Sequence, residues 1–170
     1  MKIAEEPYDL IGSVPSRLKA GLVSAVKSVS PKCFFDEDGS ALKREIRELD
    51  DAIASNLEAQ GYAVQTNFCP FLDNRFNVDL AIPEQKLLIE IEKGKQPRLE
   101  LDILKIASAC SQFLDRWRYG ALVVPASYIE LPLAGRQSPY AYLKRLGPLL
   151  QPLFTGIEGL TIIGYDDPRR

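Results

Sequence analysis

Apolar residues recur at helical spacing in four stretches of the chain and form short strand-like runs in five others. The helical pattern covers residues 15–30, 41–60, 97–113 and 138–146. Continuous or alternating apolar runs predict strands over residues 62–68, 77–82, 87–92, 120–125 and 160–165. Residues 1–12 show neither pattern and are expected to be irregular.

The order of these elements predicts the fold class. Two helices are followed by three strands, then by a helix, a strand, a helix and a last strand. Consecutive strands favour antiparallel pairing, whereas a helical crossover leads to a parallel neighbour. We therefore expect an α/β fold with a mixed central sheet and helices on both faces. The 170 residues suit one domain, with a helical extension over 1–38 and a core motif region over 40–125.

Residue types at the helix ends agree with the predicted boundaries. Ser40 is a plausible N-cap for the helix over 41–60, and Gly61 is a plausible stop after it. Ser138 and Pro139 form an N-cap and first-turn pair for the last helix, which is predicted to end at Leu146.

Composition narrows the possible chemistry. The hydrophobic content of 46% and the charged content of 26% are typical of a globular protein. The chain has no apolar run of ~18 residues and no signal-peptide pattern, so we expect a cytoplasmic protein without a membrane span. Three cysteines lie far apart and histidine is absent, which excludes the usual zinc sites and histidine-dependent triads. Any metal would be held by oxygen ligands, which favours magnesium, calcium or manganese.

Carboxylates interrupt the two central predicted strands. Asp79 lies within the run 77–82, and Glu90 and Glu92 lie within the run 87–92. Because side chains alternate across a strand, Glu90 and Glu92 are expected on one face. An acid in an otherwise buried strand is costly unless something pairs with it, and three acids close together indicate a divalent cation. Asp79 and Glu90 are its predicted ligands, and the carbonyl of Ile91 can add a third.

This pattern resembles the PD-(D/E)xK nuclease superfamily. Asp79 is followed, after ten residues, by Glu90-x-Glu92, with a helix and a strand before the pattern and a helix after it. The resemblance spans roughly residues 40–125 and implies the restriction endonuclease-like fold with an α-β-β-β-α-β core. It implies that Asp79 and Glu90 bind the catalytic metal. Val78 stands where the family often has proline.

Glu92 stands where this family has a lysine that assists the attacking water. A glutamate here is similar to a BamHI/BglII-like variant of the family, and it implies that Glu92 orients or deprotonates the water. The same branch takes an acid from the preceding helix, for which Glu45 is the candidate. A lysine displaced to Lys95, or to Lys105 on the next helix, is the alternative.

The resemblance implies a small Mg²⁺- or Mn²⁺-dependent DNA endonuclease. Since one such site cuts one strand, a double-strand cut favours a homodimer, the commonest symmetric assembly. The chain as a whole is slightly acidic, at net charge −2, so contacts to DNA require a local basic surface. The residues expected to form this surface are Lys93, Lys95, Arg98, Lys105, Arg116 and Arg118.

Each assignment has a structural alternative. Glu92 can be a strand-end acid paired with a neighbouring lysine, Asp79 can cap a turn, and Glu45 can be a solvated border residue of its helix. Residues 116–119 can be a helix end whose aromatic side chains fill the core. The whole chain can also be a catalytically inactive protein that keeps the fold as a DNA-binding or scaffold module. The missing lysine favours this alternative, whereas the three carboxylates favour a nuclease.

Overall fold

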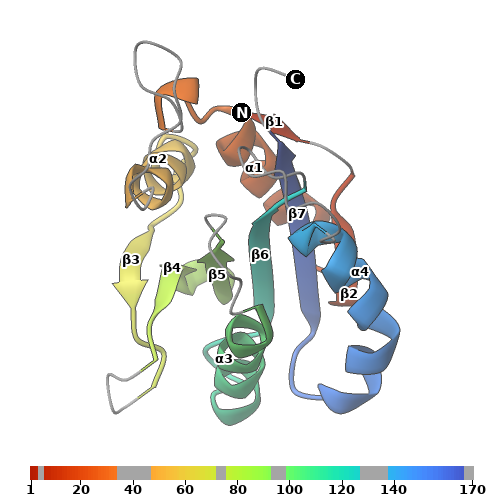
Figure 1. Ribbon diagram of the computed structural model, residues 1–170. Coiled ribbons are helices and arrows are strands. Elements are labelled where there is room, and N and C mark those ends of the chain that lie inside the picture. Colours follow the sequence, from red (N-terminus) through yellow and green to blue (C-terminus); the bar gives the residue numbers. More distant parts are fainter. Residues whose placement is uncertain (4–5, 34–46, 72–75, 93–98, 127–137, 167–170) are drawn as a thin grey trace.

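The computed structural model of the chain describes residues 1–3, 6–33, 47–71, 76–92, 99–126 and 138–166 (Figure 1). Within these ranges, seven strands form one sheet: β1 (Lys2–Ile3), β2 (Tyr8–Gly12), β3 (Gln65–Phe68), β4 (Val78–Ile82), β5 (Leu87–Ile91), β6 (Tyr119–Pro125) and β7 (Gly159–Asp166). The α-helices described are α1 (Ser16–Lys27), α2 (Arg47–Glu58), α3 (Leu99–Gln112) and α4 (Pro139–Leu150). None of these helices combines the length and the apolar character that crossing a bilayer requires.

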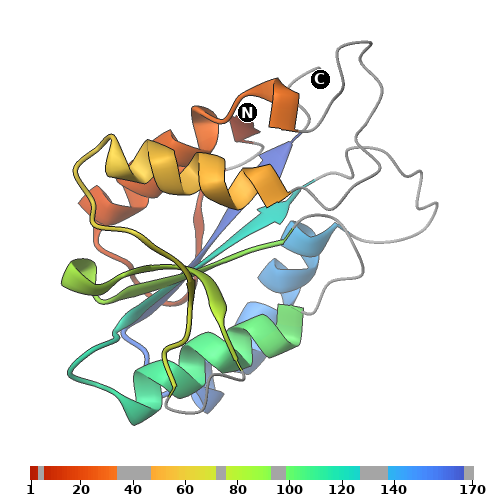
Figure 2. The same cartoon turned by 90° about the vertical axis from the view of Figure 1, so that its left-hand side faces the viewer.

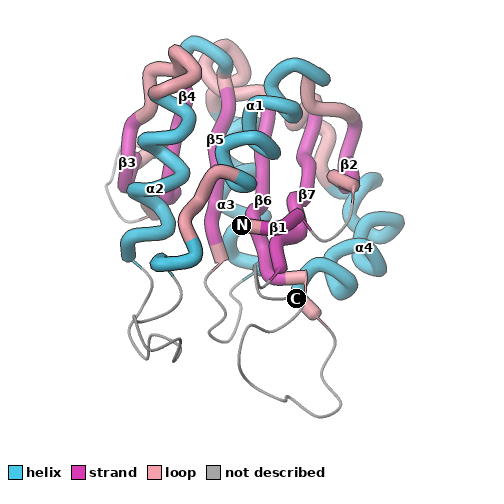
Figure 3. The backbone as a smooth tube through the Cα atoms, turned by 90° about the horizontal axis from the view of Figure 1, so that it is seen from above, coloured by secondary structure: helices cyan, strands magenta, loops and turns pink. Residues whose placement is uncertain are grey.

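The sheet is mixed, as the element order predicts. Its strands lie in the order β1-β7-β6-β5-β4-β3, and β2 also pairs with β7 (Figure 3). β3 pairs with β4, and β4 with β5, in antiparallel fashion, whereas β5 pairs with β6, and β6 with β7, in parallel fashion. Helix α3 connects β5 to β6, because parallel strands need a long crossover. The observed order α2, β3, β4, β5, α3, β6 is the order predicted for the core, and the α/β fold class is confirmed.

Helices cover both faces of the sheet. Figure 2 shows α1 and α2 on one side of the strands and α3 and α4 on the other. On the α1/α2 face, Leu80, Ile82, Leu87 and Ile89 pack with residues of α1 and α2 such as Leu22 and Ile53. On the α3/α4 face, Ala81, Leu88 and Leu122 pack with residues such as Ile103, Ile106 and Leu143. All five residues of β5 are buried, which explains why its sequence is apolar apart from Glu90.

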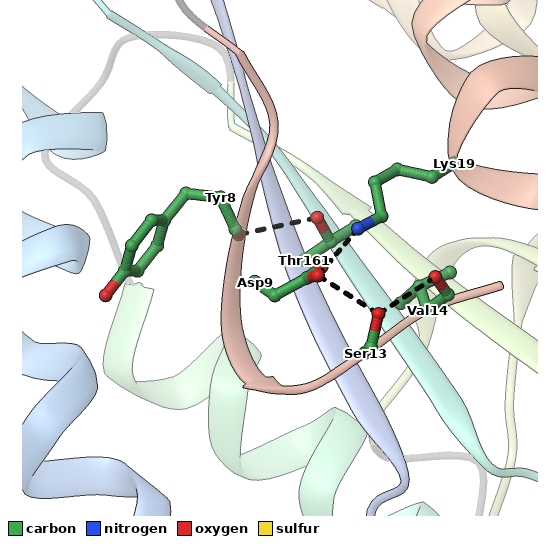
Figure 4. A network of polar contacts seen from close by, with 6 residues as sticks. All are labelled: Tyr8, Asp9, Ser13, Val14, Lys19 and Thr161. Atoms are coloured by element: carbon green, nitrogen blue, oxygen red, sulfur yellow. Dashed lines mark hydrogen bonds and ion pairs between the residues drawn. The ribbon is translucent and has the colours of Figure 1, made fainter. Parts of the chain in front are cut away.

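The prediction that residues 1–12 are irregular is wrong, because this segment contains the strands β1 and β2. β1 and β2 both pair with β7 in antiparallel fashion, with a register irregularity between Asp9 and Ile11. Polar contacts then fix β2 to its surroundings (Figure 4). Lys19 Nζ of α1 lies 2.6 Å from Asp9 Oδ2, and the hydroxyl of Ser13 donates to the same oxygen at 3.1 Å. Because the strand that pairs with β1 and β2 lies near the other end of the chain, local periodicity does not indicate them.

The boundaries of two helices test the predicted end signals. The hydroxyl of Ser138 accepts a hydrogen bond from the Ala141 amide at 3.1 Å, which confirms the N-cap of α4. The helix does not end at Leu146 as predicted but continues through Pro148 to Leu150. Gly61, with φ of +88°, follows α2 in the left-handed conformation, in agreement with the predicted stop. Ser40, the predicted N-cap of this helix, lies outside the described residues.

Candidate active site

Asp79 and Glu90 lie on neighbouring strands and on the same face of the sheet. β4 and β5 pair in the register Leu80↔Ile89, Ala81↔Leu88 and Ile82↔Leu87. One further step of this register would set Asp79 opposite Glu90, just beyond the last paired residues Leu80 and Ile89. By alternation, Asp79 shares its face with Ala81 and Glu90 shares its face with Leu88, and both of these belong to the core under α3 and α4. Directly opposed residues of an antiparallel pair have Cβ atoms about 5 Å apart.

The carboxylate of Asp79 is held by the backbone of β5. Its Oδ2 accepts the amide of Ile91 at 2.7 Å, so this side chain takes the place of a carbonyl at the end of the ladder. The edge strand β3 is also irregular beside it, because Asn67 has a φ of 48° and lies between the paired residues Thr66 and Phe68. The hydrogen bond to Ile91 therefore directs Asp79 toward the carboxyl end of β5.

Glu90 is buried and contacts a lysine from α3. Its side chain is 6% exposed, and its Oε1 contacts Nζ of Lys105. The same ammonium group lies 3.0 Å from Oδ1 of Asp102 and donates to the carbonyl oxygen of Asn77 at 3.1 Å. Lys105 thus binds oxygen atoms from β5, from its own helix and from the residue preceding β4. This contact joins α3 to both strands that carry the acids.

Burial and charge change the protonation of this cluster. Burial is the main cause that raises the pKa of Glu90 from 4.5 to about 9; the charges of Asp79 and Asp102 act in the same direction, and Lys105 opposes them. For Lys105, burial alone lowers the pKa, but Glu90 and Asp102 together raise it above its ordinary value. Lys105 is therefore an ammonium at neutral pH, and Glu90 retains its proton unless another cation approaches it.

Glu92 follows the end of β5, and its described contacts are with β6 and β7. Its amide donates to the carbonyl of Val123 at 2.9 Å, and its own carbonyl accepts the hydroxyl of Tyr165 at 2.7 Å. Burial raises the pKa of Tyr165, and the charge of Glu92 adds to this effect. Tyr165 belongs to the core under α1 and α2. These contacts do not join Glu92 to Glu90, and the role of Glu92 as a base stays a prediction.

The other predicted site residues fall into two groups. Glu45, Lys93, Lys95 and Arg98 lie outside the described residues. Arg116 and Arg118 precede β6, whose Tyr119 pairs with Leu87 at the start of β5. The amide of Arg118 bonds the carbonyl of Lys86, four residues before Glu90, which corresponds to about 13 Å along a strand.

The structure therefore does not bring Arg116 and Arg118 to the acids. The guanidinium of Arg118 pairs with Glu158 at 2.9 Å. Between the two arginines, Trp117 is 3% exposed and packs edge-on against Phe68, with ring centroids 5.3 Å apart. For Trp117 this confirms the alternative in which the aromatic residues after α3 fill the core.

Within the described ranges, no group of three or more Asp, Glu or Cys side chains is arranged to hold a metal ion. Magnesium, however, usually takes only one or two protein carboxylates and completes its shell with water and phosphate oxygens. Asp79 and Glu90 fit that requirement as a pair. For Ile91, the contact seen is its amide to Asp79, and ligation by its carbonyl stays a prediction.

Two members of the cluster were not assigned from the sequence. Asp102 lies three residues before Lys105 on α3, a spacing at which helical side chains meet, and this signal was present in the sequence. Nothing in the sequence predicts the contact of Lys105 with the carbonyl of Asn77. It forms only because α3 packs beside the residue that precedes β4.

No family model matches the chain, and no curated protein matches it at a significant level. The resemblance to PD-(D/E)xK nucleases therefore rests on the residues and on the element order described above.

The protonation of Glu90 predicts a pH-dependent stability. Its pKa in the folded protein is raised above 4.5, so the folded state holds a proton that the unfolded state has lost between pH 4.5 and about 9. This contribution to the free energy of unfolding is complete below pH 4.5 and is lost as the pH rises through 9. One such group changes that free energy by up to ~1.4 kcal/mol per pH unit. Glu90→Gln should remove this component, as measured by urea unfolding in EDTA from pH 5 to pH 8.

The matched control is Glu158→Gln, which neutralises a carboxylate that is half exposed. Its pH dependence should equal that of the wild type. Equal slopes for the wild type and Glu90→Gln would show that Glu90 is ionised in the folded protein and would contradict the prediction.

Proposed function

We propose that this protein is a Mg²⁺- or Mn²⁺-dependent phosphodiesterase that cleaves DNA as an endonuclease. The observation that supports this best is the placement of Asp79 and Glu90 on the neighbouring strands β4 and β5. Asp79 is held by the amide of Ile91 at 2.7 Å, and the ammonium group of Lys105 contacts Glu90. Two carboxylates beside one cationic side chain are the groups that phosphodiester cleavage needs for charge neutralisation and for placing water.

Asp79 and Glu90 would hold the metal, which when bound supplies positive charge to the phosphate being cut. Lys105 has the properties of a phosphate partner rather than of a base, since its raised pKa keeps it protonated. With a cation bound, Glu90 would hold Lys105 less strongly, and the ammonium group of Lys105 could donate to a phosphate oxygen. The base that activates water is then left to Glu92, as its sequence position implies.

A second function is favoured by the same cluster. The ammonium group of Lys105 already lies among oxygens of Glu90, Asp102 and Asn77, an environment that a metal ion would also occupy. If Lys105 permanently replaces the cation, the protein keeps the fold without catalysis and acts as a DNA-binding or scaffold module. The two functions differ in whether the site takes up a metal.

Cleavage tests the first function directly. Wild-type protein should nick or cut plasmid DNA in Mg²⁺ or Mn²⁺ and lose this activity in EDTA. Asp79→Asn and Lys105→Met should each lose about 10²-fold or more in rate, because each removes a group that stabilises charge in the transition state. Gel assays of initial rates give these values, and Glu158→Gln serves as the control that retains activity.

Two outcomes separate the candidates. Loss of cleavage in Glu92→Gln with metal affinity retained in calorimetry would support Glu92 as the base. A wild-type protein that neither binds Mg²⁺ nor cuts DNA, together with a Lys105→Met variant that gains Mg²⁺ affinity, would rule out the nuclease and support the scaffold function.

The position of the basic residues predicts which of them contact DNA. Arg116 and Arg118 lie at the far end of β5 and β6 from Glu90. We therefore propose that the DNA contacts are made by Lys93, Lys95 and Arg98, which follow Glu92 in the sequence. Lys93→Ala/Lys95→Ala should weaken DNA binding and reduce its salt dependence by about two phosphate contacts. Arg118→Ala should leave both unchanged. Fluorescence anisotropy across a salt series measures this difference, and a reversed ranking would overturn the assignment.

A double-strand cut by a single-site chain calls for two copies. We therefore expect a homodimer on DNA, so that light scattering with Ca²⁺ present should give a complex with the mass of two chains plus one duplex. A monomer that only nicks plasmid DNA under conditions of saturating protein would contradict the dimer while leaving the phosphodiesterase in place.

A further inference from the structure

An apolar cavity of about 490 Å³ lies next to the acid pair, a size that suits a small organic ligand. One side is a face of α3 that contributes Leu101, Leu104, Lys105, Ser108 and Gln112, and the other residues are three phenylalanines, Phe71, Phe76 and Phe113. None of these residues except Lys105 has a role in the site described above.

The aromatic residues of the cavity form a connected set. Phe71 packs edge-on against both Phe76 and Phe113, with ring centroids 6.4 Å apart in each pair. Phe76 is nevertheless 46% exposed, and Leu101 and Leu104 on the opposite side are 38% and 50% exposed. Large apolar side chains that stay exposed around a cavity are typical of a ligand site.

Lys105 connects this cavity to the proposed active site. Its side chain lines the cavity, and its ammonium group contacts Glu90. The phenylalanine side of the cavity is connected to Lys105 as well. Phe76 directly precedes Asn77, whose carbonyl accepts a hydrogen bond from Lys105. A ligand in the cavity therefore lies one side chain away from the acid pair.

We propose that this cavity binds one unpaired nucleobase of the strand whose phosphate lies at Lys105. This inference rests on the proposed function and deepens it, because it names the substrate class. Phenylalanine rings stack with bases of any sequence, and Ser108 and Gln112 can hydrogen-bond a base edge. A purely aliphatic ligand would offer no hydrogen-bond partner to the side chains of Ser108 and Gln112, which is costly where they become buried.

The nature of the cavity also selects between forms of nucleic acid. Bases in an intact duplex are stacked and paired, so they reach a protein cavity only when they are single-stranded or turned out of the helix. The protein should therefore prefer single-stranded DNA, or duplexes with a mismatch or unpaired base near the cut, over a fully paired duplex of the same length.

Binding of fluorescent oligonucleotides in EDTA tests this without any cleavage. Wild-type protein should bind a single strand more tightly than the matched duplex at equal ionic strength. Phe76→Ala should weaken single-strand binding about tenfold or more, as expected for the loss of one stacked base, whereas Phe76→Trp should restore it. Leu149→Ala is the control, because Leu149 is 67% exposed on α4 and does not line the cavity.

An oligonucleotide series with one abasic position sharpens the test. If a base occupies the cavity, one oligonucleotide of the series lacks that base. Wild-type protein should bind this oligonucleotide as weakly as Phe76→Ala binds the intact strand. Combining the abasic strand with Phe76→Ala should weaken binding no further. Circular dichroism checks that each variant is folded. Additive effects, or a Phe76→Ala variant that binds like the wild type, would overturn the proposal.

Two further outcomes separate this proposal from the proposed function. Metal-dependent cleavage that persists unchanged in Phe76→Ala would overturn the base site and leave the nuclease standing. Single-strand binding that depends on Phe76 in a protein without cleavage would support the base site and reject the nuclease. A change of oligomeric state in Phe76→Ala, with binding unaltered, would identify the cavity as a self-association surface and overturn the proposal.

Discussion

A carboxyl group buried in the middle of an apolar strand is the constraint on which this part of the structure depends. Glu90 is 4% exposed as a residue, and a group in that environment must be protonated or paired. Lys105 meets this requirement from α3, and it also contacts Asp102 and the carbonyl of Asn77. The contact between the Lys105 ammonium group and the Glu90 carboxyl group therefore helps to fix the position of α3 over β4 and β5.

The topology of the sheet explains why these groups meet. The antiparallel strands β3, β4 and β5 end where the parallel strands β5, β6 and β7 begin, so β5 belongs to both halves. The crossover from β5 to β6 must return along one face, and this carries α3 back past the end of β5 (Figure 2). Since the ladder between β4 and β5 gives way to the Asp79 carboxylate at that end, the acid pair and the helix face are adjacent.

The chemistry of the cluster depends on a competition between cations. Without a metal, burial keeps Glu90 protonated at neutral pH, and the ammonium group of Lys105 contacts its carboxyl group. A divalent ion held by Asp79 and Glu90 would displace that proton and release Lys105 toward a phosphate. The same arrangement would be inert if Lys105 held the site against metals. The nuclease and the scaffold that we propose as alternatives thus differ in one equilibrium rather than in their fold.

Much of this protein is determined locally by its sequence. Apolar periodicity identified α1, α3 and the four strands β4 to β7, and the placement of Asp79 and Glu90 within them indicated the acid pair before any coordinates. Local pattern did not indicate β1 and β2, which exist through pairing with β7 at the far end of the chain. Nor did it show that Lys105 contacts Glu90, or that Arg116 and Arg118 lie at the opposite end of β5. Periodicity reports which side of an element is buried, whereas the partner of a buried charge is decided by strand register and helix docking, which act between residues distant in sequence.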